Sequence, residues 1–144
     1  KAYFTKFPSV KKYLDGMRRQ AAEIGYVETL LGRKRYFPAL QGKINVQMKN
    51  REEREAINAP IQGTAADIMK LAMLKIPSAL KAAGLKGKML LQVHDELVLE
   101  CPKNETQKTA QVVQDTMANA YPLSIPLETE ARAGANWGEM SVLK

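Results

Sequence analysis

Three consecutive ionisable residues, His94, Asp95 and Glu96, separate two apolar runs, 88–93 and 97–101. The pattern predicts a β-hairpin with a charged tip. Adjacent carboxylates in such a place can bind Mg²⁺, which takes one or two protein carboxylates together with phosphate oxygens of a substrate. A pair of such ions assists phosphoryl transfer. A charged turn that faces water, with a structural or solvated histidine, is the alternative, and it is the more frequent use of these residue types.

A second candidate is a row of hydrogen-bond donors on a predicted helix. Arg54, Asn58 and Gln62 are four residues apart, so they line one helical face. The minor groove of a duplex presents acceptors at every base pair, so such a row can contact DNA of any sequence. The ordinary polar face of an amphipathic helix is the alternative.

A third candidate is the basic run Arg33, Lys34 and Arg35, from which Arg33 and Arg35 are the predicted phosphate contacts. Residues 1–54 carry 13 basic and 5 acidic side chains, net +8, whereas residues 55–144 carry 9 and 10, net −1. A field on one part of the chain favours a polyanion, nucleic acid before an anionic membrane surface. A basic surface that only faces water is the alternative.

Composition excludes several classes of protein. The 144 residues are 45% hydrophobic and 26% charged, which suits one globular domain with its own core. Cys101 is the single cysteine and His94 the single histidine, so neither a disulfide framework nor a zinc cluster can form. The sequence has no phosphate-loop, dinucleotide-binding or nucleophile-elbow motif. No apolar run is long enough to span a membrane, and we expect a soluble, intracellular protein.

Hydrophobic periodicity and turn residues predict the order of the elements. In chain order they are a helix over 9–24, a hairpin over 26–38, a loop over 41–50, a helix over 51–76, a short helical piece up to Gly84, the hairpin around 94–96, a helix over 105–121 and a strand over 124–131. This order lacks βαβ alternation, so the predicted class is α+β with an antiparallel sheet packed against helices.

The helix over 51–76 has several expected features. Asn50 is its expected N-cap, and Pro60 is expected to kink it or to break its hydrogen bonding locally. Gly63 leaves room for another backbone close by. The expected core stripe consists of the apolar residues at helical spacing: Ile57, Ile61, Ala65, Ile68, Met69, Ala72 and Ile76.

Segments 58–67 and 92–98, taken together, indicate a protein family more specifically than either segment does alone. They closely resemble two motifs of the bacterial DNA polymerase I family, the family A DNA polymerases. The resemblance extends from Tyr3 to Trp137 and so covers essentially the whole chain. It implies that residues 1–48 are the end of the fingers subdomain and 49–144 the C-terminal part of the palm subdomain, with a palm-type antiparallel sheet.

The resemblance also implies roles for individual residues. In the family's palm motif C the aspartate binds catalytic metal, the glutamate lies beside it and the histidine lies near the primer terminus, which assigns Asp95 and Glu96 to metal and catalysis and His94 to catalysis. Arg54, Asn58 and Gln62 match helix residues that contact the primer–template duplex near the growing end.

The implied function is DNA-directed DNA polymerisation with two Mg²⁺ ions, on a primer–template duplex and deoxynucleoside triphosphates. The family's second metal-binding aspartate and its nucleotide-binding fingers helix lie upstream of this region, so we expect this chain alone to be inactive. Half of a split enzyme and a non-catalytic duplex DNA-binding module are the alternatives. The upstream polymerase portion is an expected partner, a membrane is not, and the hairpin's open edges suggest self-association. The expected location is the cytoplasm of a bacterium or phage host, or an organelle.

Overall fold

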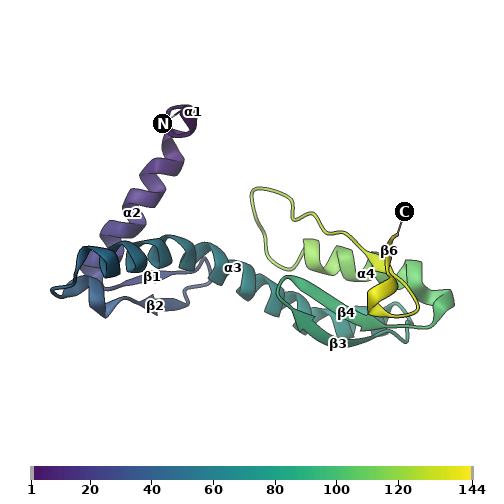
Figure 1. The fold of residues 1–144 in the computed structure, drawn as a ribbon. Coiled ribbons are helices and arrows are strands. Elements are labelled where there is room, and N and C mark those ends of the chain that lie inside the picture. Colours follow the sequence, from purple (N-terminus) through teal and green to yellow (C-terminus); the bar gives the residue numbers. More distant parts are fainter. Residues whose placement is uncertain (1, 144) are drawn as a thin grey trace. The chain divides into compact units, whose positions relative to one another are not determined.

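The computed structural model describes residues 2–143 (Figure 1). Contacts divide the chain into two compact units, residues 1–65 and 66–144, and the division falls within the long helix α3, Val46–Ala82. Each unit is described by itself below. The limits 1–48 and 49–144 for the fingers and palm parts stay a prediction, because compactness alone does not assign a subdomain.

The first unit contains two helices, a hairpin and the start of α3. The elements before α3 are α1 Ala2–Lys6, α2 Pro8–Ile24, β1 Tyr26–Glu28, β2 Lys34–Tyr36 and the 3₁₀ turn η1 Pro38–Gln41. The predicted helix over 9–24 and the hairpin over 26–38 are confirmed. Gly25 ends α2 with φ 80°, a left-handed conformation that glycine adopts without a Cβ penalty.

Helix α3 begins earlier than expected, at Val46. Asn45 caps it, because its side-chain oxygen accepts a hydrogen bond from the Met48 N–H at 2.8 Å. Asn50 is therefore inside the helix, and its prediction as the N-cap is wrong, as is the loop expected up to residue 50. Both errors arise because a cap is recognised by geometry, and several residues in 41–50 could have supplied the oxygen.

Helix α3 also ends later than expected. It continues through Pro60 and Pro77 to Ala82, so the expected separate helical piece after Pro77 is wrong. Pro60 interrupts the helix's hydrogen bonding only at its own missing N–H, and a kink there stays a prediction. A proline inside a helix removes one donor without removing the flanking bonds. Gly84, with φ 69°, then stops the helix as predicted.

The core of the first unit lies between α2, the β1–β2 hairpin and α3. Val27 and Phe37 are almost fully buried, and they pack with Ala21, Ala56 and Ala59. The small side chains of Ala56 and Ala59 let the hairpin approach α3 closely. In this half of α3 the expected core stripe is wrong at Ile61, which is 58% exposed, and at Ala65, which is also exposed, whereas Ile57 is half-buried.

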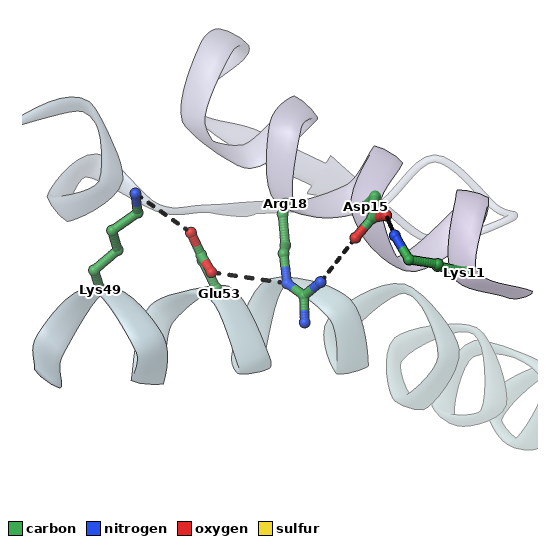
Figure 2. Close-up of polar contacts among 5 residues, drawn as sticks. All are labelled: Lys11, Asp15, Arg18, Lys49 and Glu53. Carbon is green, nitrogen blue, oxygen red and sulfur yellow. Dashed lines mark hydrogen bonds and ion pairs between the residues drawn. The ribbon is translucent and has the colours of Figure 1, made fainter. Parts of the chain in front are cut away.

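Ion pairs attach α2 to the beginning of α3 (Figure 2). Arg18 donates to Asp15 at 3.0 Å and lies 3.7 Å from the Glu53 carboxylate across the interface. Lys11 pairs with Asp15 one turn away, and Lys49 pairs with Glu53 at 3.8 Å. The Lys11 hydrogen bond, followed by the charges of Lys11 and Arg18, holds the pKa of the Asp15 carboxyl below its ordinary value.

The second unit packs the rest of α3 against a helix and a hairpin. Its further elements are β3 Lys88–Val93, β4 Glu96–Glu100, η2 Lys103–Glu105, α4 Thr106–Ala118, β5 Arg132–Ala133, η3 Trp137–Glu139 and β6 Ser141–Val142. Its core contains Ile68, Ala72, Ile76, Leu80, Val113 and Ala120, with Leu97 and Leu99 of β4 packed against it. The core stripe is thus confirmed at Ile68, Ala72 and Ile76.

The strand expected over 124–131 is wrong. The short strand β5 begins only at Arg132 and pairs with β6, which the sequence did not suggest. Pro126 has no N–H to give to a ladder. The carbonyl of Thr129 instead accepts a hydrogen bond from the side chain of Gln114, on α4, at 2.8 Å.

Three antiparallel two-stranded sheets, β1–β2, β3–β4 and β5–β6, are present in the described part of the chain. With the helices they make an α+β fold, so the predicted class is confirmed. Across residues 2–143, no helix combines the length and the apolar character needed to span a membrane.

Candidate functional site

The second hairpin presents the charged motif on a tight turn. Val93 pairs with Glu96 and Gln92 with Leu97, so His94 and Asp95 are the two residues of the turn. Glu96 belongs to β4 and not to the tip, which corrects the expected extent of the tip by one residue. Two-residue turns suit the twist of paired strands.

His94 has the backbone conformation that such a turn requires. Its φ is 53°, and among the described residues other than glycine it alone has a positive φ. This region is disfavoured for a residue with a Cβ. The side-chain amide of Gln92 donates a hydrogen bond to the His94 carbonyl, which fixes the turn from one side. A position that ordinarily favours glycine is therefore occupied by an ionisable side chain.

The carboxylates of Asp95 and Glu96 are exposed, and within residues 2–143 neither has a hydrogen-bond or ion-pair partner. They are hard oxygen donors of the kind that Mg²⁺ prefers. No group of three or more His, Cys, Asp or Glu side chains in the described residues could hold a metal ion. The donor set therefore fits a shared Mg²⁺ site whose further ligands are substrate phosphates or other side chains.

The predicted row on α3 is fully on the surface of the first unit. Arg54, Asn58 and Gln62 are each exposed, and none has a hydrogen-bond or ion-pair partner in the part of the chain that the structure describes. One guanidinium and two amides are thus available as donors. Ile61, also exposed, adds an apolar side chain beside Gln62.

Arg33 and Arg35 are both engaged within the protein. Arg35 pairs with Glu55 on α3 and lies over the ring of Phe37, 5.4 Å from its centroid. Arg33 donates to the carbonyl of Gly63 at 3.0 Å. Both arginines therefore attach the first hairpin to α3, whatever they contact in addition.

Two further residues at this attachment, Thr29 and Thr64, were not predicted from the sequence. Thr64 accepts a hydrogen bond from the Leu30 N–H at 3.0 Å, and Thr29 lies against Gly63. The one signal for them was Gly63 inside a helix, which predicted a close approach. The close neighbour is the Thr29 side chain and not the backbone that was expected.

The predicted residues fall into two groups. His94, Asp95 and Glu96 lie together in the unit of residues 66–144. The other five, Arg33, Arg35, Arg54, Asn58 and Gln62, lie together in the unit of residues 1–65. Within the first unit, Arg33 and Arg35 belong to the hairpin and the other three to α3.

Comparisons with a family model, with known sequences and with solved structures agree with one another. Residues 1–139 match the model of DNA polymerase family A. The chain is 48% identical over 137 residues to DNA polymerase I of Streptococcus pneumoniae, which is 95% of this chain and 16% of that protein. It is 45% identical over 135 residues to the thermostable DNA polymerase I of Thermus aquaticus, again 16% of that protein.

A solved structure is also similar. It is the POL domain of Pol1 from M. smegmatis in complex with DNA primer-template and dNTP. The TM-score is 0.80 at 49% identity, over 88% of this chain and 22% of that one. The chain thus spans about a sixth of the length of the curated relatives it matches.

Proposed function

The chain belongs to the family A DNA polymerases, and we propose that it supplies the carboxylate turn and part of the primer–template interface of a DNA-directed DNA polymerase. In that reaction the primer 3′ hydroxyl attacks the α-phosphate of a deoxynucleoside triphosphate, and pyrophosphate leaves. The observation that carries the proposal is a pair of exposed carboxylates without partners in the described residues: Asp95 on the turn and Glu96 at the start of β4.

Asp95 and Glu96 are the residues that would hold Mg²⁺. When bound, two such ions favour the attacking oxygen and the leaving oxygen of the displacement. Mg²⁺ retains waters and accepts substrate phosphate oxygens, so the two carboxylates would be part of the ligand set, together with the upstream aspartate of the family. The paired strands hold Asp95 on a short turn and Glu96 on β4, which reduces the freedom of both carboxylates before substrate arrives.

Arg54, Asn58 and Gln62 would hold the primer–template duplex. Their donors match the acceptors that every base pair offers in the minor groove, so they would sense duplex geometry without selecting a sequence. The net charge of +8 on residues 1–54 adds a salt-dependent attraction for the phosphates. His94 would lie near the primer terminus, as in the family motif that it matches.

Replacement of Asp95 by Asn in the full-length protein tests the catalytic assignment. Primer extension with Mg²⁺ and four deoxynucleotides should fall by roughly 100-fold or more, because a metal-binding carboxylate is lost. Duplex binding, measured in parallel, should be retained. Glu100→Gln is the matched control, since it removes one exposed carboxylate from the end of the same hairpin and should leave extension unchanged.

A non-catalytic duplex-binding module is the second candidate, and the exposed donor row on α3 favours it independently of the carboxylates. The two candidates differ in one outcome. Unchanged extension by the Asp95→Asn protein would leave only the binding module.

We also propose that this chain alone does not extend a primer. The family's second metal-binding aspartate and its nucleotide-binding helix belong to the upstream part, and the chain spans 16% of its relatives. The purified chain should give no more product than a reaction without protein. If the chain is half of a split enzyme, mixing it with the upstream half should restore extension.

Self-association of the isolated chain is a related proposal. Leu90 is 56% and Leu91 40% exposed on β3, which pairs with β4 alone among the described strands. Open edges with apolar side chains favour pairing with another copy. Sedimentation should detect dimers or larger species, and Leu90→Lys should reduce them; a monomer at high concentration contradicts the proposal.

A further inference from the structure

The turn of the first hairpin is hydrogen-bonded to one turn of α3. The Arg33 guanidinium donates to the Gly63 carbonyl at 3.0 Å, and the Leu30 N–H donates to the Thr64 hydroxyl at 3.0 Å. One contact uses a side chain of the hairpin and the other its backbone. Two consecutive residues of the helix, directly after Gln62, are therefore held from the same side.

The hairpin turn is itself closed by its own hydrogen bonds. Thr29 N–H donates to the Arg33 carbonyl at 3.0 Å, and Arg33 N–H donates to the Thr29 hydroxyl at 3.1 Å. Thr29 also fills the space beside the helix, because a Cβ on Gly63 would lie 2.6 Å from its methyl carbon. Glycine at this position is thus required for the close approach of the two elements.

The part of α3 that is bonded to the hairpin turn has a low intrinsic helical stability. Pro60 gives no N–H to the carbonyl of Ala56, and glycine inside a helix, as at Gly63, lowers helical stability. Asn58 and Gln62 lie on either side of Pro60, and Gln62 directly precedes Gly63. The conformation of the helix at these two side chains therefore depends on contacts from outside the helix.

A hollow of about 280 Å³ lies beside these contacts, and its charged lining residues are Glu28, Arg33, Lys34 and Arg35. The three basic side chains are each engaged by an oxygen of the protein. Lys34 lies 3.8 Å from the Glu28 carboxylate, Arg35 pairs with Glu55, and Arg33 donates to the Gly63 carbonyl. The contact with the Gly63 carbonyl favours a structural use of Arg33.

We propose that Arg33, Thr29 and Thr64 are positioning residues for polymerisation: the hairpin turn fixes the helical turn that presents Gln62 and Asn58 to the duplex. The inference rests on the proposed function, which gives Asn58 and Gln62 their role as duplex contacts. It assigns Arg33 an action through the helix in place of a direct contact with DNA.

Thr64→Val is the central test, because it removes the hydroxyl without changing shape or charge. Binding of a labelled primer–template duplex should weaken about 2- to 10-fold, the effect of one lost hydrogen bond. Thr64→Ser keeps the hydroxyl and should bind nearly as the natural chain does. If Thr64→Val binds normally and remains folded by circular dichroism, the proposal is wrong.

The salt dependence of binding separates positioning from phosphate contact at Arg33. A lost phosphate contact lowers the slope of log K against log salt by about 0.9. We expect Arg33→Ala to weaken binding with an unchanged slope. A slope reduced by about 0.9 would assign Arg33 to a phosphate.

A double-mutant cycle separates positioning from general stability. In a Gln62→Ala background the effect of Thr64→Val on binding should largely vanish, since the side chain that it positions is gone. Additive effects would contradict the proposal. Gln62→Ala and Asn58→Ala alone test the proposed function: if neither affects binding, the duplex face itself is wrong, whatever the result at Thr64.

Discussion

The guanidinium of Arg35, on β2, pairs with the carboxylate of Glu55, on α3, and Arg51 Nε lies 3.3 Å from the other oxygen of the same carboxylate. One carboxylate thus forms ion pairs with two guanidinium groups, in a part of the chain that is otherwise strongly basic. Glu55 directly follows Arg54, the first residue of the proposed duplex-binding row. Its negative charge therefore reduces the local attraction for phosphates.

Replacement of Glu55 by Gln should tighten duplex binding. The change removes a negative charge and releases Arg35 and Arg51, so the affinity should rise a few-fold at low salt and the salt slope should steepen. Glu128→Gln changes the net charge equally in the other unit and is the matched control. Equal tightening by both variants would show that net charge alone matters.

The ion pairs of Asp15 with Lys11 and Arg18, both within α2, predict that stability depends on pH. The pKa of Asp15 is held below its ordinary value of 3.8 by the Lys11 hydrogen bond. A lowered pKa in the folded state stabilises the fold fully above the ordinary pKa, and this contribution is lost as pH falls through the lowered value. Asp15→Asn should therefore lower the melting temperature at pH 7, and the difference from the natural chain should shrink below about pH 4.

The Asp15 side chain is 41% exposed, so the difference at pH 7 should be small. Glu23→Gln is the control, since Glu23 is exposed on the same helix and has no ion-pair partner in the described residues. A difference between Asp15→Asn and the natural chain that stays constant from pH 7 to pH 3 would show that the carboxylate does not act through these pairs.

Elements with strong local signals were predictable from the sequence. Gly25 and Gly84 end helices at the expected places, and the run 94–96 marks the second hairpin to within one residue. These features depend on residues close to one another in the chain. Distant contacts do not affect them.

Some of the features that were not predicted depend on a partner that is distant in sequence. Ile61 has the spacing of a core residue but is exposed, because the hairpin packs against the small side chains of Ala56 and Ala59. Spacing gives the period of a helix and not the side on which a neighbour lies. The phosphate contact of Arg33 stays a prediction, but its hydrogen bond to the Gly63 carbonyl, 30 residues away, was not predictable from the type of residue.

In the C-terminal turn, alanine substitutions at two glycines are predicted to differ clearly in their effect on stability. A Cβ on Gly134 would lie 2.2 Å from the Glu139 carbonyl oxygen, whereas a Cβ on Gly138 would lie 3.5 Å from the Asn136 side chain. Gly134→Ala must move backbone and should cost about 1–3 kcal/mol. Gly138→Ala makes an ordinary contact and should remain within about 0.5 kcal/mol of the natural chain.

Hydrogen exchange at Leu143 reports the same difference locally. Its N–H donates to the Ala131 carbonyl at 2.9 Å, beside the β5–β6 pair. Exchange should accelerate in Gly134→Ala and stay slow in Gly138→Ala. Equal protection in both variants would mean that the turn adjusts without disturbing the strands.

Substitutions of His94 are predicted to affect stability and activity differently. Its φ of 53° suits glycine, so His94→Gly should be more stable than His94→Ala by about 1 kcal/mol. Both variants lack the imidazole that the proposed function places near the primer terminus. In the full-length protein both should therefore lose primer extension to the same degree, while thermal unfolding ranks the glycine variant above the alanine variant. Recovery of extension in His94→Gly alone would mean that the residue serves the backbone of the turn and that its ring has no part in the reaction.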